Sequence, residues 1–269
     1  MKKTIGIIGC GTIGTQLAKA IEKRFFEKAK LLGICDADAK KAKALQALLG
    51  SKPKVMKAGE IIKRCELIIE AASATISANI ARSCIVKGKD VMIMSVGGIL
   101  KDPKIIQLTN RSKAKLYIPS GAICAIDAVK AANIAGINEA TLITAKPPHA
   151  YSGAAYVVRK KINLSSIKTK KVIFEGPAAE AAVGFAQNIN VAATLSLAGI
   201  GAKKTHVKII ADPALKRNTH QVEVRGKFGV LSAKTENVPS PGNPKTSYLA
   251  VLSAIATLKG ILENVKIGS

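Results

Sequence analysis

Near its N-terminus the chain carries Thr4-Ile-Gly-Ile-Ile-Gly-Cys-Gly-Thr-Ile-Gly-Thr-Gln-Leu-Ala-Lys-Ala-Ile21, a short apolar run that breaks into glycines and resumes with helical spacing. This pattern predicts a strand, a tight turn and a helix. Gly9, Gly11 and Gly14 fit G-x-G-x-x-G, in which the first glycine permits the turn, the second lets the backbone approach a pyrophosphate, and the third allows close helix–strand packing. The helix then presents its first N–H groups to an anion, so we expect Thr12 and Ile13 to contact the cofactor as well. Glycine-rich turns are common, and the prediction therefore needs support from the rest of the chain.

A second apolar run, Leu31-Leu-Gly-Ile-Cys-Asp36, supplies that support, because it ends in an acid about 20 residues after the glycines. A carboxylate at this spacing accepts hydrogen bonds from a ribose diol. Asp36 or Asp38 could instead simply cap the following helix. Since the glycine pattern lies upstream, we expect Asp36 to contact the cofactor. A carboxylate here favours NAD over the 2′-phosphate of NADP, although Lys40 and Lys41 lie just beyond and could allow NADP as well.

The balance of charge is the most unusual feature of the composition. The 269 residues include 42 Lys and Arg against 17 Asp and Glu, a formal charge of +25. Such an excess can indicate a nucleic-acid partner. Here the lysines are scattered without a compact basic tract, and aromatic residues, which would stack on bases, make up only 3%. We therefore expect a lysine-rich surface that attracts anionic substrates, and no nucleic-acid partner.

The cysteines and the apolar runs bear on metal binding and on location. None of the cysteines forms a C-x-x-C pair or lies near a histidine in the sequence, so neither a metal site nor a disulfide framework is expected at Cys10, Cys35, Cys65, Cys84 or Cys124. The N-terminal apolar run is broken by glycines, unlike a signal peptide, and no run is long enough to span a bilayer. We expect a cytoplasmic protein without a membrane partner.

Alternating strand and helix patterns follow the glycine-rich turn. Apolar runs typical of buried parallel strands cover 55–56, 66–73, 90–95 and 115–119, and helical spacing covers 37–49, 76–86, a segment from about Pro103, and 126–135, with a loop at 96–98. This alternation predicts an α/β fold with a doubly wound parallel sheet, a Rossmann domain, in residues 1–136.

Beyond residue 136 the pattern changes to strands in succession. Strand-like runs occupy 141–144, 171–174, 207–210, 220–224 and 229–232, and helical composition occupies 178–186 and 191–198. They predict an α+β domain over 137–245 with a mixed or antiparallel sheet, which would carry the substrate site. The last periodic segment, a helix within about 246–263, is expected to pack back on the first domain.

Two further segments follow strands and therefore lie at the sheet edge where α/β folds bind ligands. Ala71-Ala72-Ser73 ends one apolar run, and we expect Ala72 and Ser73 to contact the cofactor. Ser120-Gly-Ala-Ile123 follows another strand, although an ordinary glycine turn explains it equally.

The candidates for proton transfer are His149, His206 and His220, because histidine titrates closest to neutrality. His149 lies in a predicted loop. In His220-Gln-Val-Glu-Val224 the alternation puts His220 on the inward face with the two valines. This geometry fits a buried structural histidine or one directed into a cleft, and the spacing alone favours the structural role.

Amide and lysine side chains give less specific signals. Asn188 and Asn190 precede an apolar helix and could hold a nicotinamide carboxamide or cap the helix. Asn243-Pro-Lys-Thr-Ser247 leads into the last helix, where Lys245 beside a helix N-terminus would suit a carboxylate. An exposed lysine with a Thr or Ser cap explains the same residues without a function.

Seven segments, spread over nearly the whole chain, run in the order of one known family. The glycine-rich turn is shared with many Rossmann proteins, whereas Asn188-Ile-Asn-Val-Ala-Ala-Thr194 and Asn243-Pro-Lys-Thr-Ser-Tyr248 are far more particular. The other segments are Glu70-Ala-Ala-Ser73, Ser120-Gly-Ala-Ile123, Val172-Ile-Phe-Glu-Gly176 and Asn218-Thr-His220. In these segments the chain resembles the L-aspartate dehydrogenases. It departs from them at Cys124, where a glycine would be expected after the isoleucine, and a side chain there leaves less room for the cofactor.

The resemblance implies a Rossmann domain joined to an α+β catalytic domain that oxidises L-aspartate to iminoaspartate with NAD or NADP, on the aspartate route of NAD biosynthesis. In reverse, oxaloacetate and ammonia are joined and reduced. It also implies that Ala122 and Asn190 contact the cofactor, that His220 is the active-site acid/base, against the preference from spacing, and that the protein is a homodimer. The two substrate carboxylates need cationic or amide donors, and we assign Lys245, Thr246 and Ser247 to them.

Two other classes of function fit parts of the pattern. Another two-domain Rossmann reductase, similar to homoserine dehydrogenase or dihydrodipicolinate reductase, would share the plan and differ in substrate. A basic dinucleotide-sensing or nucleic-acid-binding protein would keep the Rossmann domain without turnover and would show salt-sensitive binding to DNA or RNA.

Overall fold

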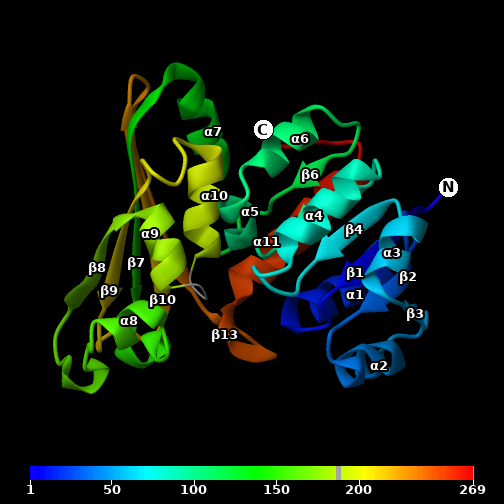
Figure 1. Cartoon of the computed structure of the whole chain (residues 1–269), viewed down its shortest axis with the longest axis horizontal. Helices are drawn as coiled ribbons and strands as arrows, with labels where there is room; N and C mark the ends of the chain where they lie inside the picture. The colour runs from blue at the N-terminus through cyan, green and yellow to red at the C-terminus, as the bar shows by residue number, and fades with distance from the viewer. Residues whose placement is uncertain (186–188, 269) are drawn as a thin grey trace. The chain divides into compact units, whose positions relative to one another are not determined.

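The computed structural model describes residues 1–185 and 189–268, with the backbone alone for Pro244 and Lys245. The contacts separate two compact units (Figure 1). One unit comprises Met1–Pro119 and Val251–Lys266, and the other contains Ser120–Ala250. Residues 120–136, which the sequence pattern assigned to the first domain, lie in the second unit, because Val129 packs in its core.

The first unit is built on a six-stranded parallel sheet in the order β3-β2-β1-β4-β5-β6 (Figure 1). This order is that of the doubly wound dinucleotide-binding fold and confirms the predicted class. The strands are β1 (Lys3–Ile8), β2 (Ala29–Cys35), β3 (Lys54–Val55), β4 (Leu67–Glu70), β5 (Asp90–Ile93) and β6 (Leu116–Tyr117). The helices are α1 (Thr12–Arg24), α2 (Ala39–Leu48), α3 (Ala58–Arg64), α4 (Ser77–Val86), α5 (Gly97–Lys101), α6 (Lys104–Asn110) and the greater part of α11 (Tyr248–Leu262).

The core of the first unit explains its near-continuous apolar strands. Ile5, Ile7, Leu67 and Ile69 of the two central strands are fully buried, as strands covered on both faces must be. Ala254 and Leu258 of α11 are buried in the same cluster, so the last helix completes this core although it is distant in sequence.

Two short helices of the first unit differ from the prediction. The loop expected at 96–98 is the start of α5, and α3 was not predicted at all. Both helices are shorter than about two turns, which leaves too little sequence for a helical repeat to be recognised.

The second unit contains a five-stranded mixed sheet in the order β11-β10-β7-β9-β8. β7 and β9 are parallel and the other neighbours are antiparallel, as the succession of strands predicted. The strands are β7 (Ile137–Lys146), β8 (Lys171–Pro177), β9 (His206–Ala211), β10 (Asn218–Gly226) and β11 (Gly229–Asn237), with a separate ribbon of β12 (Pro239–Ser240) and β13 (Asn243–Ser247). The helices are α7 (Ile126–Ala135), α8 (Ala155–Arg159), α9 (Ala178–Gly184) and α10 (Asn190–Ala198), with short 3-10 turns at Pro148–Tyr151 and Leu164–Ser166.

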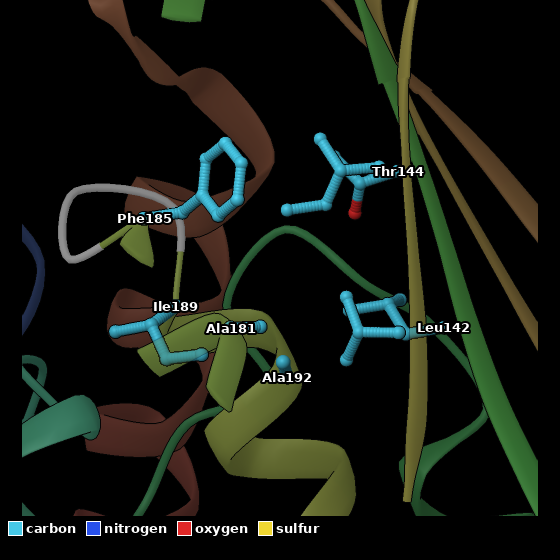
Figure 2. A pocket seen from close by; sticks show the side chains of 8 residues that line it. Leu142, Thr144, Ala181, Phe185, Ile189 and Ala192 are labelled. Atoms are coloured by element: carbon cyan, nitrogen blue, oxygen red, sulfur yellow. The ribbon is translucent and has the colours of Figure 1, made fainter. Parts of the chain in front are cut away.

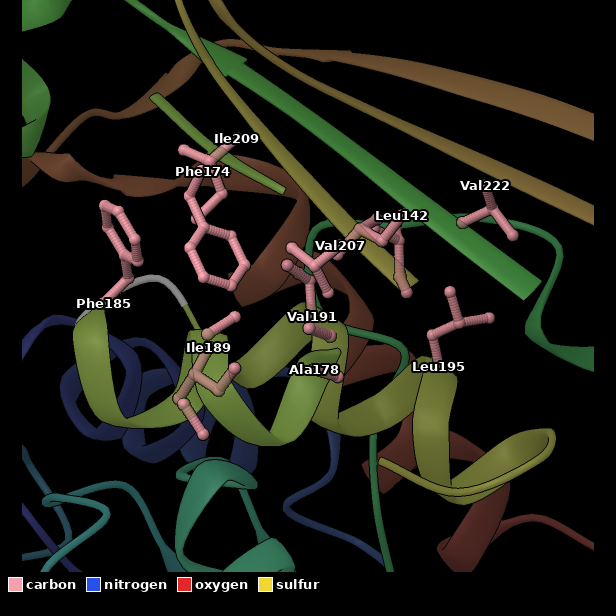
Figure 3. Packing of buried hydrophobic residues seen from close by; sticks show 14 of the residues in the cluster. Leu142, Phe174, Ala178, Phe185, Ile189, Val191, Leu195, Val207, Ile209 and Val222 are labelled. Atoms are coloured by element: carbon pink, nitrogen blue, oxygen red, sulfur yellow. The ribbon is translucent and has the colours of Figure 1, made fainter. Parts of the chain in front are cut away.

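Helices α9 and α10 cover one face of this sheet. Figure 3 shows Leu142, Val207 and Val222 of the strands directed toward Ala178 and Leu195 of the helices, and these residues belong to one buried cluster. Alternation along each strand therefore decides which side chains face the helices and which face away.

Candidate cofactor and active-site residues

The glycine-rich turn has the geometry that its spacing predicted. Gly9 has a φ of +108°, and a Cβ there would lie 2.4 Å from the carbonyl carbon of Ala71. A Cβ on Gly14 would lie 1.9 Å from the carbonyl oxygen of Gly9. Gly11, by contrast, would place a Cβ where no atom lies within 4 Å. Gly9 and Gly14 thus let the turn pack closely, and Gly11 leaves open the approach that a pyrophosphate needs.

Helix α1 begins directly at this turn. Gly11 is its N-cap residue and no side chain caps the helix, so the first N–H groups, those of Thr12, Ile13 and Gly14, have no side-chain cap acceptor. Such a helix end attracts the charge of a phosphate. The open space at Gly11 and this uncapped helix start together fit the pyrophosphate of a dinucleotide.

Asp36 lies at the end of β2, beside the turn. Its Oδ2 accepts a hydrogen bond from the Cys10 N–H at 2.7 Å, and its Oδ1 accepts one from the Asp38 N–H at 2.9 Å. Asp38, not Asp36, caps α2, because its carboxylate accepts from the Lys40 N–H at 2.9 Å. A carboxylate has about four acceptor positions, so Asp36 can hold the turn and still receive a ribose hydroxyl.

Glu70 lies beside the predicted cofactor contacts Ala72 and Ser73, and the spacing did not reveal its structural role. Its carboxylate is fully buried at the end of β4 and accepts hydrogen bonds from the Ala72 N–H at 2.8 Å and the Ser95 N–H at 3.0 Å. Burial raises the pKa of this carboxyl group, although the hydrogen bonds oppose the shift. Glu70 therefore holds in place the Ala72–Ser73 turn that was expected to contact the cofactor. The sequence signal that could have indicated this role is an acidic residue at the end of an otherwise apolar strand.

His220 lies on the helix-covered face of the second unit's sheet, as the alternation predicted, and only 4% of it is exposed. Its Nδ1 lies 3.0 Å from the Thr144 hydroxyl on the neighbouring strand. Burial, and secondly the positive charge of Lys146, lower the pKa of His220 to about 3. The imidazole is therefore neutral near pH 7.

Thr144 also lines a small pocket between the sheet and the helices. Figure 2 shows Thr144 and Leu142 on one side of it, opposite Phe185, Ile189 and Ala192. The lining is almost wholly apolar, and Thr144 and His220 are both buried, so their hydrogen bond lies out of contact with bulk water.

The remaining candidates of the second unit lie before α7, at the start of α10 and in β13. Ala122 is buried, and its carbonyl oxygen accepts hydrogen bonds from β11. Asn190 is exposed as the first residue of α10, and Ile189 holds the N-cap position. Thr246 and Ser247 lie half-buried in β13, and Ser247 directly precedes α11, where a helix cap was the alternative to a binding role. Asn188 and the side chain of Lys245 lie outside the described residues.

The structure also places the other two histidines and Cys124. His206 is paired with Glu175 at 3.2 Å on the surface, and His149 is exposed in a 3-10 turn, so neither shares the covered face with His220. Cys124 does not have a positive φ, whereas Gly121 and Ala125 do, so its backbone conformation does not require glycine.

Two negative findings apply to residues 1–185 and 189–268. No group of His, Cys, Asp and Glu side chains within them could hold a metal ion. No helix among them is long and apolar enough to cross a membrane.

The doubly wound unit with its open glycine turn, joined to a mixed-sheet unit that carries a buried histidine, defines a two-domain NAD(P)-dependent oxidoreductase. Sequence-family models match residues 127–261 as "Aspartate dehydrogenase, C-terminal" and residues 9–119 as "Homoserine dehydrogenase, NAD binding domain". An L-aspartate dehydrogenase of Methanosarcina acetivorans is 49% identical over 98% of this chain and 99% of its own length. One of Nitrosopumilus maritimus is 40% identical over 99% and 100%. The chain belongs to the aspartate dehydrogenase family.

Solved structures agree with this assignment. The crystal structure of aspartate dehydrogenase from Thermotoga maritima matches with a TM-score of 0.78 and 25% identity over 100% of both chains. A hyperthermophilic archaeal homoserine dehydrogenase in complex with NADPH matches with a TM-score of 0.58 and 14% identity, over 99% of this chain and 100% of that one, which shows a shared fold alone.

Proposed function

We propose that this chain is an NAD(P)-dependent L-aspartate dehydrogenase, which oxidises L-aspartate to iminoaspartate and, in reverse, joins oxaloacetate to ammonia and reduces the product. The observation that carries the proposal is the identity of 40–49% over nearly the full length with relatives named L-aspartate dehydrogenase. The glycine turn, the uncapped start of α1 and Asp36 provide the donors and acceptor that a dinucleotide needs. We also assign the enzyme to NAD biosynthesis in the cytoplasm, and to a homodimer.

In this reaction the nitrogen of L-aspartate loses a proton as hydride leaves Cα. NAD(P), when bound, supplies the hydride acceptor. We assign His220 to the proton transfer, at the substrate nitrogen or at the water that later hydrolyses the imine. Its neutral imidazole can accept a proton, and the bond to Thr144 orients the ring. A dicarboxylate bound nearby would raise the low pKa of His220, because negative charge favours the imidazolium.

Binding roles are proposed for residues of both units. Gly9, Gly11, Thr12, Ile13 and Gly14 would hold the pyrophosphate, with Ala72, Ser73, Ala122 and Asn190 as further cofactor contacts. Lys245, Thr246 and Ser247 would receive the two substrate carboxylates. Asp36 favours NAD, since its charge repels a 2′-phosphate, and Lys40 and Lys41 on the next helix allow some use of NADP.

The test is a panel of substrates, with each reaction monitored by the absorbance of the reduced cofactor that it forms. L-aspartate is compared with D-aspartate, L-glutamate, L-homoserine and no substrate, and NAD is compared with NADP. Turnover with L-aspartate alone is expected. Turnover with L-homoserine instead would favour the homoserine dehydrogenase alternative, which the NAD-binding family model also matches. Tight NADH binding without turnover on any substrate would favour a sensor.

A further inference from the structure

The loop that carries Ala122 is conformationally strained. Gly121 has a φ of +71°, and Ala125, which has a side chain, has a φ of +63°. A residue that has a Cβ is strained in this left-handed region, so such a loop persists only where its surroundings hold it. Those surroundings come from β11, more than a hundred residues further along the chain.

Two polar side chains of β11 hold the Ala122 carbonyl. The Thr235 hydroxyl donates to it at 2.9 Å, and the Asn237 amide Nδ2 donates to it at 3.0 Å. The same amide donates to the Thr235 hydroxyl oxygen at 3.2 Å. The amide nitrogen, the hydroxyl oxygen and the carbonyl oxygen thus lie within hydrogen-bond distance of one another. Asn237 is only 4% exposed, which makes an unpaired group there costly.

This set of bonds also joins the loop to the strand of His220. Thr235 lies directly opposite His220 in the antiparallel register, so the two side chains share the covered face. The Thr235 hydroxyl is 3.4 Å from the His220 carbonyl oxygen, a longer contact than the one to Ala122. One hydroxyl therefore lies between the backbone of a proposed cofactor contact and that of the proposed acid/base.

We infer that Thr235 and Asn237 are positioning residues, which fix the Ala122 loop against the strand of His220 in the conformation that binds the dinucleotide. The inference rests on the proposed function only for the role of Ala122 and His220. Since the Ala122 carbonyl already accepts two bonds, a ligand would meet other atoms of this loop. Without the two donors, the strained backbone at Ala125 would relax into other conformations, and binding would bear the cost of reordering the loop.

The test measures NADH affinity directly, by calorimetry and by NADH fluorescence anisotropy. Thr235→Val and Asn237→Leu keep the side-chain shapes and remove the donors, and each is expected to weaken NADH binding about tenfold. Thr235→Ser restores the hydroxyl and should recover most of the affinity. Ser232→Ala removes a hydroxyl from the exposed face of the same strand and should leave it unchanged.

A structural role alone would give a different result. If Thr235→Val and Asn237→Leu lowered the melting temperature but bound NADH as tightly as the parent protein, the inference would be wrong. Because the experiment measures cofactor binding, it still tests the positioning role of Thr235 and Asn237 if L-aspartate proves not to be the substrate. Should Asn237→Leu fail to fold, Thr235→Val against Thr235→Ser decides the question.

Discussion

The hydroxyl of Thr144 and Nδ1 of His220 lie 3.0 Å apart on adjacent strands, and both side chains are buried on the covered face of the sheet. A neutral imidazole has one N–H and one acceptor nitrogen. The bond at Nδ1 therefore fixes the orientation of the ring, and Nε2 is the nitrogen that takes no part in this bond. Because both side chains are buried, the bond lies out of contact with bulk water. His220 is therefore oriented by the protein before any substrate arrives.

Replacing Thr144 with Val should lower kcat about tenfold, because the side-chain shape remains and only the orienting bond is lost. The affinity for NADH should stay the same. Thr141→Val is the matched control, since Thr141 lies on the opposite face of the same strand. Equal kcat values for Thr144→Val and the parent protein would remove the orienting role.

Replacing His220 with Ala should reduce turnover of L-aspartate by about a hundredfold or more, the usual contribution of a general acid/base. NADH binding should be nearly intact, because the glycine turn and Asp36 lie in the other unit. His206→Ala serves as the control, since His206 is paired with Glu175 on the surface. Unchanged turnover in His220→Ala would return His220 to the structural role that its spacing alone favoured.

The burial of His220 makes stability depend on pH. Its pKa falls from 6.5 to about 3 in the folded protein, chiefly through burial. Between these two values the unfolded chain binds more protons than the folded one, so stability is lost as the pH drops. We expect His220→Gln to lose less stability than the parent between about pH 6 and pH 4, measured by urea unfolding at each pH. If the free energy of unfolding fell equally with pH in the two proteins, the low pKa assigned to His220 would be wrong.

The sequence predicted the site where the signal was local. The glycine turn was predicted from the spacing of Gly9, Gly11 and Gly14. The face on which His220 lies was predicted from the alternation of residues along its strand. The bonds of Thr235 and Asn237 to Ala122 join positions 113 and 115 residues apart, and no local pattern indicates such a pairing. The same holds for the pairing of Glu70 with Ser95, which lies just beyond the end of β5. Resemblance to a family, not periodicity, gave His220 its catalytic assignment.

The glycines of the turn should differ sharply when each is changed to Ala. Gly14→Ala would force a Cβ to within 1.9 Å of the Gly9 carbonyl oxygen, so we expect a large loss of stability or no folded protein. Gly11→Ala meets no atom within 4 Å and Gly11 has an ordinary φ of −74°, so the melting temperature should be retained. NADH affinity should nevertheless fall about tenfold, because the methyl group occupies the approach to the helix N-terminus. A Gly11→Ala protein with full affinity would place the pyrophosphate elsewhere.

Under the proposed function, we expect cofactor choice to depend on the charge of Asp36 more than on its hydrogen bonds. Asp36→Asn keeps an oxygen that can accept from the Cys10 N–H, which the carboxylate now receives at 2.7 Å, but it removes the negative charge. The ratio of kcat/KM for NAD to that for NADP should therefore fall about tenfold, with Lys40 and Lys41 available to the 2′-phosphate. Asp38→Asn is the control, because it removes the same charge two residues away while keeping a good helix cap. If both variants shifted the ratio equally, the preference would come from the overall electrostatic potential of the surface and not from Asp36 itself. A parent enzyme that already prefers NADP would show that Asp36 does not exclude the 2′-phosphate.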